Sequence, residues 1–442
     1  MTGNTQAGRP DGEGVRAREP CLVSVACAIL PEIMNIWYLS AHDQPRGQSA
    51  RTYDFARELT RRGHDVTMFT NSYCHWTHVE RLMSGERWRI EVIDGIRVVW
   101  LRTIHYTGNG LMRGLNMLSN AWRSIQAAHE LTDLPNVVVG PSVPLGTGWA
   151  AARIAGMKGA AFVFEVRDVW PIALVDDGGM SRHSPVYVAF RLLEKYLYRR
   201  AQRISATMPY LHRHVSESGA DPGKVSWVPN GVDFDRFAGW EAYDGGEVGS
   251  LVVMYVGGFG VAHDVITIVR AAKILHESGV VGIRFVIVGN GVKRAECERE
   301  AVFGKLGNVE FRDSVPKAQV PKVQMEADVL VAAVTDSASY RFGLNLNKIF
   351  DYFASARPVI FAGKAPNDPI IASGAGFSVP PENPRALVEA LLRLSAMSPA
   401  ERREMGLRGR RYVESEYDMR TLADRMENLL TEASRLSVHD SH

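Results

Sequence analysis

The segment ARTYDFARELTRRGHDVTMFT, residues 50–70, predicts how the first part of the chain folds. Its first part reads as a helix, Gly63 and His64 form a turn, and a short apolar run follows. A helix, a tight turn and a buried strand in this order make up the repeating unit of an α/β sheet.

The same alternation continues further along the chain. Apolar runs at 136–140, 159–166 and 203–207 are each followed by helix-like sequence. Strands that alternate with helices form a parallel sheet covered on both faces, which is a doubly wound α/β layer. We therefore expect one such layer in the first half of the chain.

A break in the apolar pattern separates this layer from a second one. A Pro-Asn-Gly turn and a Gly-Gly pair mark the break, and strand-like runs alternate with helical sequence again behind it. The predicted fold class is α/β, with two Rossmann-like doubly wound domains that face a cleft. The predicted parts are a disordered tail (1–20), an N-terminal domain (21–228), a linker (229–250), a C-terminal domain (251–410) and a C-terminal helix (411–442). The first strand of the N-terminal domain is expected in the apolar run 21–30. The C-terminal helix is long enough to cross back to the N-terminal domain.

The composition of the chain excludes several classes of protein. With 46% hydrophobic and 23% charged residues, the chain is typical of a soluble globular protein. The 51 basic and 49 acidic residues lack the excess of positive charge expected of a nucleic-acid binder. The four cysteines form no C-x-x-C pair, which argues against a disulfide framework or a zinc site and fits a reducing, cytoplasmic location.

The start of one predicted helix carries unusual polar residues. Apolar residues recur at helical spacing from Asn347 until Pro358 stops the pattern, which predicts a buried helix. Asn345, Asn347 and Lys348 occupy its front end, although only ten residues of the chain are lysines. Asp351 lies about one turn further on, and the sequence leaves open whether it pairs with Lys348 or accepts hydrogen bonds from a ribose.

Two glycine-rich loops of the second domain also follow strands and lead into helices. They contain Gly258 and Gly260 in the first loop, and Gly289 and Gly291 in the second. Backbone amides and helix dipoles make such loops suitable for an anion, and a diphosphate would suit the three elements together, although α/β turns use glycine in any case. A dinucleotide-binding interpretation is the weaker alternative, because Arg294 replaces the third glycine of that fingerprint.

The order of several motifs resembles one enzyme family. RTYDFARELTRRGHDVTMFT, FVFEVRDVWP, VPNGVD, YVGGFG, FVIVGNG and NKIFDYFASARPV occur in the order and near the spacing of the family 4 retaining glycosyltransferases of the GT-B fold. The forms EVRDVWP and NKIFDY are most similar to the branch that contains bacterial O-antigen N-acetyl-L-fucosamine transferases. The resemblance extends over most of the chain.

This resemblance implies a reaction and a set of site residues. It implies transfer of a hexosyl or N-acetylhexosaminyl group from a nucleotide-diphosphate sugar, of the UDP-linked kind, without a catalytic metal or another cofactor. The acceptor would be a polysaccharide precursor, a lipid-linked sugar or a natural product. The implied catalytic residues are Asp351, in place of a ribose-binding glutamate, Lys348, and Asp168 on the acceptor side. The implied donor-binding residues are Gly47, Gly258, Phe259, Gly260, Asn290, Gly291, Lys293, Val315, Leu344, Asn345, Asn347, Lys348 and Asp351.

One departure from the family pattern motivates alternative functions. Gly343 stands eight residues before Asp351, where the wider family has its first glutamate. A catalytically inactive sugar-nucleotide-binding partner protein is therefore one alternative, and a sugar-nucleotide epimerase of the same fold is another. Glu165, Arg167 and Asp168 are expected to end a strand at the cleft, where they either orient the acceptor or form a structural ion pair.

Two segments leave a contact with a membrane open. Residues 110–125 and 188–204 are amphipathic enough to rest on a membrane surface, and both also fit ordinary helices that pack within the domain. The corresponding location is cytoplasmic, either free or peripheral at the inner face of the membrane.

Overall fold

We analysed a computed structural model of the chain. It describes residues 32–47, 51–74, 79–106, 108, 111–176, 178–239 and 241–439. The predicted tail and the apolar run 21–30 lie outside the described residues. The first described strand is β1, Asn35–Leu39.

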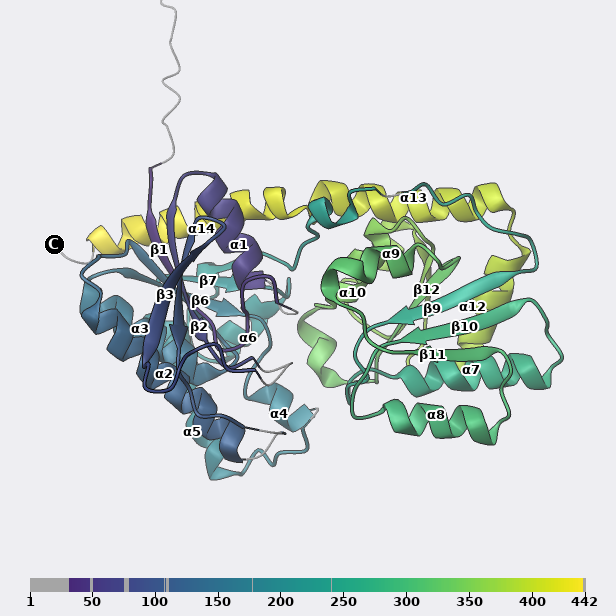
Figure 1. The fold of residues 1–442 in the computed structure, drawn as a ribbon, viewed down its shortest axis with the longest axis horizontal. Coiled ribbons are helices and arrows are strands. Elements are labelled where there is room, and N and C mark those ends of the chain that lie inside the picture. The colour runs from purple at the N-terminus through teal and green to yellow at the C-terminus, as the bar shows by residue number, and fades with distance from the viewer. Residues whose placement is uncertain are drawn as a thin grey trace, which may run out of the picture. The chain divides into compact units, whose positions relative to one another are not determined.

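The first half of the described chain forms an eight-stranded sheet in the order β3-β4-β2-β1-β5-β6-β7-β8 (Figure 1). Its strands are parallel except for β3, which pairs antiparallel with β4 at the edge. The strands after β1 are β2 (Asp65–Asn71), β3 (Trp88–Ile93), β4 (Ile96–Leu101), β5 (Val137–Pro141), β6 (Ala161–Val166), β7 (Arg203–Ala206) and β8 (Val225–Trp227).

Helices cover both faces of this sheet, because side chains along each strand alternate between two apolar cores. In β1, Trp37 and Leu39 join one core, whereas Ile36 and Tyr38 join the other. The first core includes α2 (Leu111–Glu130), α3 (Leu145–Lys158), α5 (Pro185–Arg200) and α6 (Leu211–Glu217), and the second includes α1 (Arg51–Arg61) and α14 (Met419–His439). Three short elements complete this part of the chain: α4 (Ile172–Asp176), η1 (Pro222–Lys224) and η2 (Phe234–Phe237).

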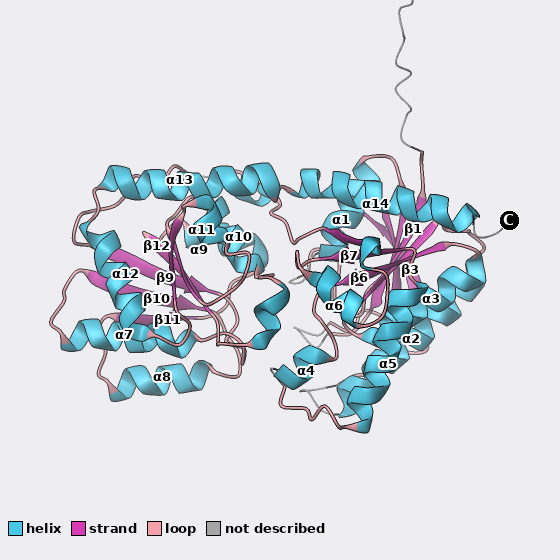
Figure 2. Ribbon diagram, turned by 180° about the vertical axis from the view of Figure 1, so that it is seen from behind, coloured by secondary structure: helices cyan, strands magenta, loops and turns pink. Residues whose placement is uncertain are grey.

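The second half forms a fully parallel six-stranded sheet in the order β11-β10-β9-β12-β13-β14 (Figure 2). Its strands are β9 (Leu251–Val256), β10 (Ile283–Val288), β11 (Val309–Arg312), β12 (Val329–Ala333), β13 (Val359–Ala362) and β14 (Gly376–Val379). One face packs on α7 (Val265–Glu277), α8 (Arg294–Phe303) and α12 (Pro384–Ala396), and the other on α10 (Asn347–Ala354), α11 (Pro369–Ser373) and α13 (Pro399–Glu416). The short elements here are η3 (Lys317–Gln319), α9 (Val320–Gln324) and η4 (Ala338–Phe342).

The chain passes between the two sheets at two neighbouring places. The amide of Val232 donates to the carbonyl of Tyr417 at 2.8 Å, so the strand-like stretch after β8 lies beside the stretch between α13 and α14 (Figure 1). Gly231 leaves no room for a side chain, since a Cβ there would lie 2.8 Å from the Tyr417 carbonyl oxygen. The helix that packs on the first sheet begins at Met419, so the predicted boundary at residue 410 falls inside α13.

The two α/β sheets confirm the predicted fold class. The apolar runs 136–140, 159–166 and 203–207 form β5, β6 and β7, as expected. In open parallel sheets, ligands bind beyond the carboxyl ends of the strands. The loops after β6, β9, β10 and β12 hold most of the residues singled out in the sequence, and the domain boundaries themselves stay a prediction.

Candidate functional site

The start of α10 carries backbone amides without side-chain caps. Its N-cap position is Leu346, whose side chain has no polar atom to accept from them. The first amides of an α-helix have no partner within the helix, and together they carry partial positive charge. Asn347, the first residue of α10, is exposed. This helix start therefore presents donors and positive potential without a protein anion to use them.

The Lys348 side chain lies close to the loop that follows β9. Its Nζ atom donates to the Tyr255 hydroxyl at 2.8 Å and lies 4.4 Å from the centroid of the Tyr255 ring. A Cβ atom on Gly257 would come within 2.9 Å of the same Nζ. Burial lowers the pKa of Lys348 to about 7. Lys348 forms no ion pair with any other residue that the structure describes.

The glycine-rich loop beside Lys348 offers two further donors. No hydrogen bond from the amides of Gly258 and Gly260 is found within the described part of the chain, and a Cβ on Gly258 would meet no atom closer than 3.9 Å. Phe259 is placed differently from our expectation. Its ring is buried in the core and its amide donates to the carbonyl of Asn290, so only the two glycines offer amides to a ligand.

The structure shows no ion pair between Asp351 and Lys348, and hydrogen bonding of Asp351 to a ribose stays a prediction. Burial raises the pKa of Asp351, and the positive charges of Arg236 and Lys317 act in the opposite direction. Arg236 follows the interdomain crossing and Lys317 lies in η3. Asp351 therefore lies in a partly buried environment near two cations.

Asn345 ties the region before α10 to the first sheet and to the interdomain crossing. Its Nδ2 atom donates to the Arg167 carbonyl at 3.0 Å, and its Oδ1 atom accepts from Nδ2 of Asn230. Each polar end of this side chain thus makes one hydrogen bond within the protein, and these two bonds hold the helix start in position.

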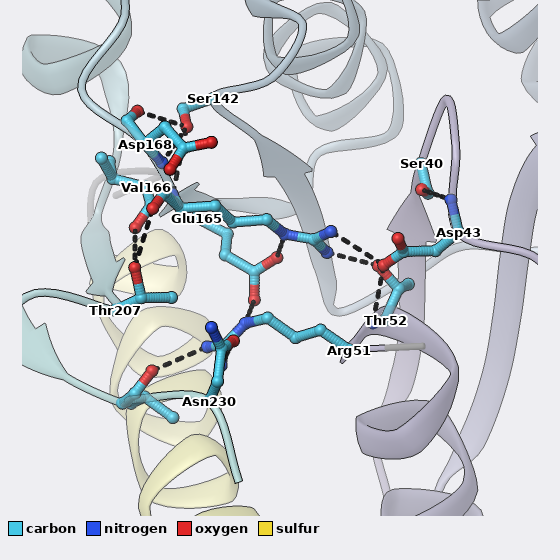
Figure 3. A network of polar contacts seen from close by, with 12 residues as sticks. Ser40, Asp43, Arg51, Thr52, Ser142, Glu165, Val166, Asp168, Thr207 and Asn230 are labelled. Carbon is cyan, nitrogen blue, oxygen red and sulfur yellow. Dashed lines mark hydrogen bonds and ion pairs between the residues drawn. The ribbon is translucent and has the colours of Figure 1, made fainter. Parts of the chain in front are cut away.

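A buried network of charges supports this contact (Figure 3). Glu165 accepts from Arg51 at 2.9 Å and from Arg167 at 2.7 Å, and Arg167 also donates to Asp43 at 2.8 Å. Arg51 also donates hydrogen bonds to the carbonyl of Pro229 and to Oδ1 of Asn230. Although burial opposes the shift, the two guanidinium groups lower the pKa of Glu165. Of the two alternatives for Glu165 and Arg167, the contacts favour the structural ion pair.

Asp168 lies next to this network but belongs to a cavity. The cavity has a volume of about 230 Å³ and is lined by Asp168, Gly343 and Asn345 together with largely apolar side chains. The carbonyl of Asp168 accepts from the Ser142 hydroxyl at 2.9 Å, which holds the loop after β6 in place. Asp168 is exposed and lines the cavity, whereas Glu165 of the same strand end is buried.

Gly343 also lines the cavity, and its backbone explains why the residue is glycine. Its φ of 122° lies in a region that favours glycine, and a Cβ there would lie 2.5 Å from Cδ of Pro209. The amide of Tyr210, the next residue after Pro209, donates to the carbonyl of Phe342. A side chain at position 343 would therefore push this loop away from the first sheet.

We expect Gly343→Glu to destabilise the protein rather than to restore the family's acidic group. The strained φ and the contact with Pro209 together predict a loss of about 2–4 kcal/mol in the free energy of unfolding. Gly343→Ala should lose nearly as much, because the clash begins at Cβ. Chemical denaturation of both variants measures the loss. A Gly343→Glu variant as stable as the original chain would show that the position accepts an acidic side chain.

The remaining predicted donor-binding residues surround these loops. Lys293 forms an exposed ion pair with Glu296 at 2.9 Å, and Leu344 is buried in the core with its amide bonded to Asn367. These two side chains are thus engaged within the protein. Gly47 lies in a turn closed by a 2.9 Å bond to the Gln44 carbonyl, Asn290 is exposed, Gly291 adopts a φ of 149° beside Phe259, and Val315 is partly buried.

Sequence reasoning missed three residues that shape the site. Tyr255 holds Lys348 from inside β9, Asn230 holds Asn345, and Lys317 adds a cation near Asp351. Tyr255 resembles any buried strand residue, so nothing in the sequence marks it. Asn230 sits in the quoted VPNGVD motif, where it was interpreted only as part of a turn.

Two family models match the chain on either side of the interdomain crossing. The model described as glycosyl transferase 4-like domain matches residues 46–231, and the model described as glycosyl transferases group 1 matches residues 250–397. The chain belongs to the family 4 glycosyltransferases of the GT-B fold. A comparison with curated protein sequences finds no significant match. The branch of N-acetyl-L-fucosamine transferases is not distinguished by these matches.

Solved structures of the same fold resemble this glycosyltransferase along most of its length. Sucrose-phosphate synthase from Thermosynechococcus elongatus is 20% identical over 90% of this chain and 98% of its own, with a TM-score of 0.68. Anabaena HepE in complex with UDP-glucose is 13% identical over 90% and 99%, with a TM-score of 0.62. An α,α-trehalose-phosphate synthase (UDP-forming) from Burkholderia vietnamiensis is 16% identical over 90% and 99%, with a TM-score of 0.66. At these identities the likeness concerns the fold.

Proposed function

We propose that this glycosyltransferase moves a sugar from a UDP-linked donor to an acceptor with retention of anomeric configuration. One observation carries the proposal: Lys348 lies at the uncapped start of α10 beside the glycine loop after β9, and no described residue supplies it with an anionic partner. A diphosphate supplies the missing anion. The UDP complexes of fold relatives such as HepE support this choice of nucleotide.

The same residues account for how the bond to the donor phosphate breaks. Cleavage leaves negative charge on the departing nucleoside diphosphate. Lys348 and the amides of Gly258 and Gly260 are preorganised to stabilise that charge, and they perform the role that a metal ion has in other transferases. Asp351 accepts hydrogen bonds from the ribose, which fixes the nucleotide beside the helix.

The cavity beside Asp168 receives the sugar and the incoming acceptor. Asp168 is our choice for orienting an acceptor hydroxyl, because it is exposed and lines the cavity. The acceptor is a polysaccharide precursor, a lipid-linked sugar or a natural product. A lipid-linked acceptor would place the protein at the inner membrane face as a peripheral protein. No helix in the described part of the chain is long and apolar enough to cross a membrane.

A second candidate is a sugar-nucleotide-binding protein without transfer activity. Gly343 favours it, because the group that contacts the sugar elsewhere in the family has no room here. Binding of the donor would then serve a partner enzyme.

Incubation with a panel of nucleotide sugars tests these functions. We expect slow release of free nucleotide from one donor, with no change on adding a metal chelator. A new sugar isomer would instead identify an epimerase, and binding without turnover would identify the inactive module. Release that stops when the chelator is added would contradict the assignment of the charge-stabilising role to Lys348 and the amides.

A further inference from the structure

The three helices on one face of the first sheet present apolar side chains to solvent. Helices α2, α3 and α5 pack on the sheet through the same core, and they lie beside one another in both views (Figure 1, Figure 2). Their outward sides should be polar if they faced only water. Instead, large apolar side chains are exposed on all three: Met112, Leu115, Leu118, Trp122, Trp149, Met157, Val186, Val188, Leu192 and Tyr196.

On α2 and α5 these side chains follow the helical repeat and form a stripe. On α5, Val188, Leu192 and Tyr196 are spaced four residues apart, and Leu192 is 63% exposed. On α2, Leu118 and Trp122 are also four apart, at 64% and 61% exposure. Helix α3 contacts both α2 and α5 and adds two exposed apolar residues, so the three helices together form an apolar patch that indicates an interaction surface.

The same helices concentrate positive charge. Together α2, α3 and α5 contain eight Lys or Arg residues and two Glu residues, a net charge of +6, whereas the whole chain carries only +2. The two acidic side chains are already paired. The buried Glu194 bonds to Arg191 of the same helix and to His214, and Glu130 pairs with Arg87, so the unpaired charge of these helices is positive. The apolar stripes are therefore bordered by basic side chains such as Arg153, Arg199 and Arg200, which are exposed.

We propose that this face, formed by α2, α3 and α5, rests on the surface of a lipid bilayer that contains anionic headgroups. Apolar and aromatic side chains that alternate with Arg and Lys are the composition of helices that lie in a membrane interface. Basic residues near the surface add attraction to anionic lipids. A second copy of the chain is a poorer occupant, because a symmetric dimer through this face would place like charges against each other.

The proposal deepens the proposed function, on which it rests, by favouring a lipid-linked acceptor. Residues 167–184 lead from the cavity at Asp168 through α4 to the start of α5. Arg182 and His183, just before α5, are exposed. A bilayer against α5 would therefore bring the headgroup of an acceptor lipid close to the segment 167–184, whose first residues line the cavity.

Co-sedimentation of the full chain with vesicles tests the proposal. We expect binding to vesicles of phosphatidylcholine and phosphatidylglycerol mixed at about two to one, and at least about tenfold weaker binding to phosphatidylcholine alone. High salt should weaken the binding to the mixed vesicles. The double variant Leu118→Glu, Leu192→Glu should bind the mixed vesicles at least about tenfold more weakly, because two charges replace inserted side chains.

A matched variant on the second sheet controls for surface charge and folding. Val281 and Phe303 are 86% and 85% exposed, so Val281→Glu, Phe303→Glu introduces the same charges far from α2 and α5 in the chain and should keep vesicle binding. Absence of binding by the unmodified chain at low salt would overturn the proposal. So would a concentration-dependent dimer, seen by sedimentation velocity, that the Leu118→Glu, Leu192→Glu variant abolishes.

Calorimetric titration with UDP separates this proposal from the proposed function. The Leu118→Glu, Leu192→Glu variant should bind UDP as the unmodified chain does. Vesicle binding without UDP binding would contradict the donor site and leave the membrane face intact.

Discussion

Replacing Lys348 with alanine is expected to weaken the binding of a nucleoside diphosphate by about 10- to 100-fold, the size of one charge-assisted hydrogen bond. Lys348 is the cation that lies at the uncapped helix start beside the Gly257 to Gly260 loop, and it forms no ion pair in the described part of the chain. Its amine donates to the Tyr255 hydroxyl and lies over the Tyr255 ring. Calorimetric titration with UDP measures the change in affinity.

Lys273 provides the control for this prediction. It is a lysine of α7 in the same domain, outside the predicted donor-binding residues, and it pairs with Glu300 of α8 at 3.7 Å. Lys273→Ala should therefore change UDP affinity by less than about threefold. If Lys348→Ala and the unmodified chain bound UDP with equal affinity, the proposed position of the diphosphate at the start of α10 would be wrong.

Replacing Glu165 with alanine is expected to cost about 3–5 kcal/mol in the free energy of unfolding, because it leaves two buried guanidinium groups without their shared carboxylate. Glu165 accepts hydrogen bonds from both Arg51 and Arg167. Arg51 in turn donates to Pro229 and Asn230 at the interdomain crossing. The loss should appear in urea denaturation as a lower midpoint with an unchanged slope.

A surface ion pair provides the comparison. Glu404 pairs with Arg411, and both side chains are more than half exposed, so Glu404→Ala should cost less than about 1 kcal/mol. If Glu165→Ala were no more destabilising than Glu404→Ala while transfer activity fell, the structural interpretation would be wrong. Glu165 would then be a candidate for orienting the acceptor, the alternative that the sequence had left open.

The α/β fold was predictable because its evidence is local and repeated. Apolar runs such as 136–140 can only be buried strands once helical sequence follows each of them, and they form the central strands of the first sheet. The antiparallel β3 and β4 hairpin at the edge was not recognised, because β3 is half exposed and lacks a clear apolar run. The single long helix expected at the C-terminus is divided into α13 and α14, since Tyr417 turns into the crossing beside Val232.

The site was predictable as a region but not as a set of contacts. Glycines after strands and a polar helix start mark where an anion fits, and Lys348 was found in this way. Whether a side chain faces the ligand or its own domain depends on residues distant in the sequence. Asn345 binds the Arg167 carbonyl 178 positions away, and Phe259 turns into the core against Tyr255. No periodicity or spacing carries that information.

The number of protons taken up when UDP binds tests the central claim most directly. Burial lowers the pKa of Lys348 to about 7, so at a pH of about 8.5 the amine is mostly neutral in the free protein. A bound diphosphate favours the charged form and raises this pKa, so binding should draw one proton from solution, and affinity should fall as the pH rises above about 7. Titrations in buffers of different ionisation enthalpy give the proton count. We predict close to one proton more for the unmodified chain than for Lys348→Met at that pH. Equal proton counts for the two proteins, with UDP bound to both, would contradict the placement of the diphosphate at Lys348.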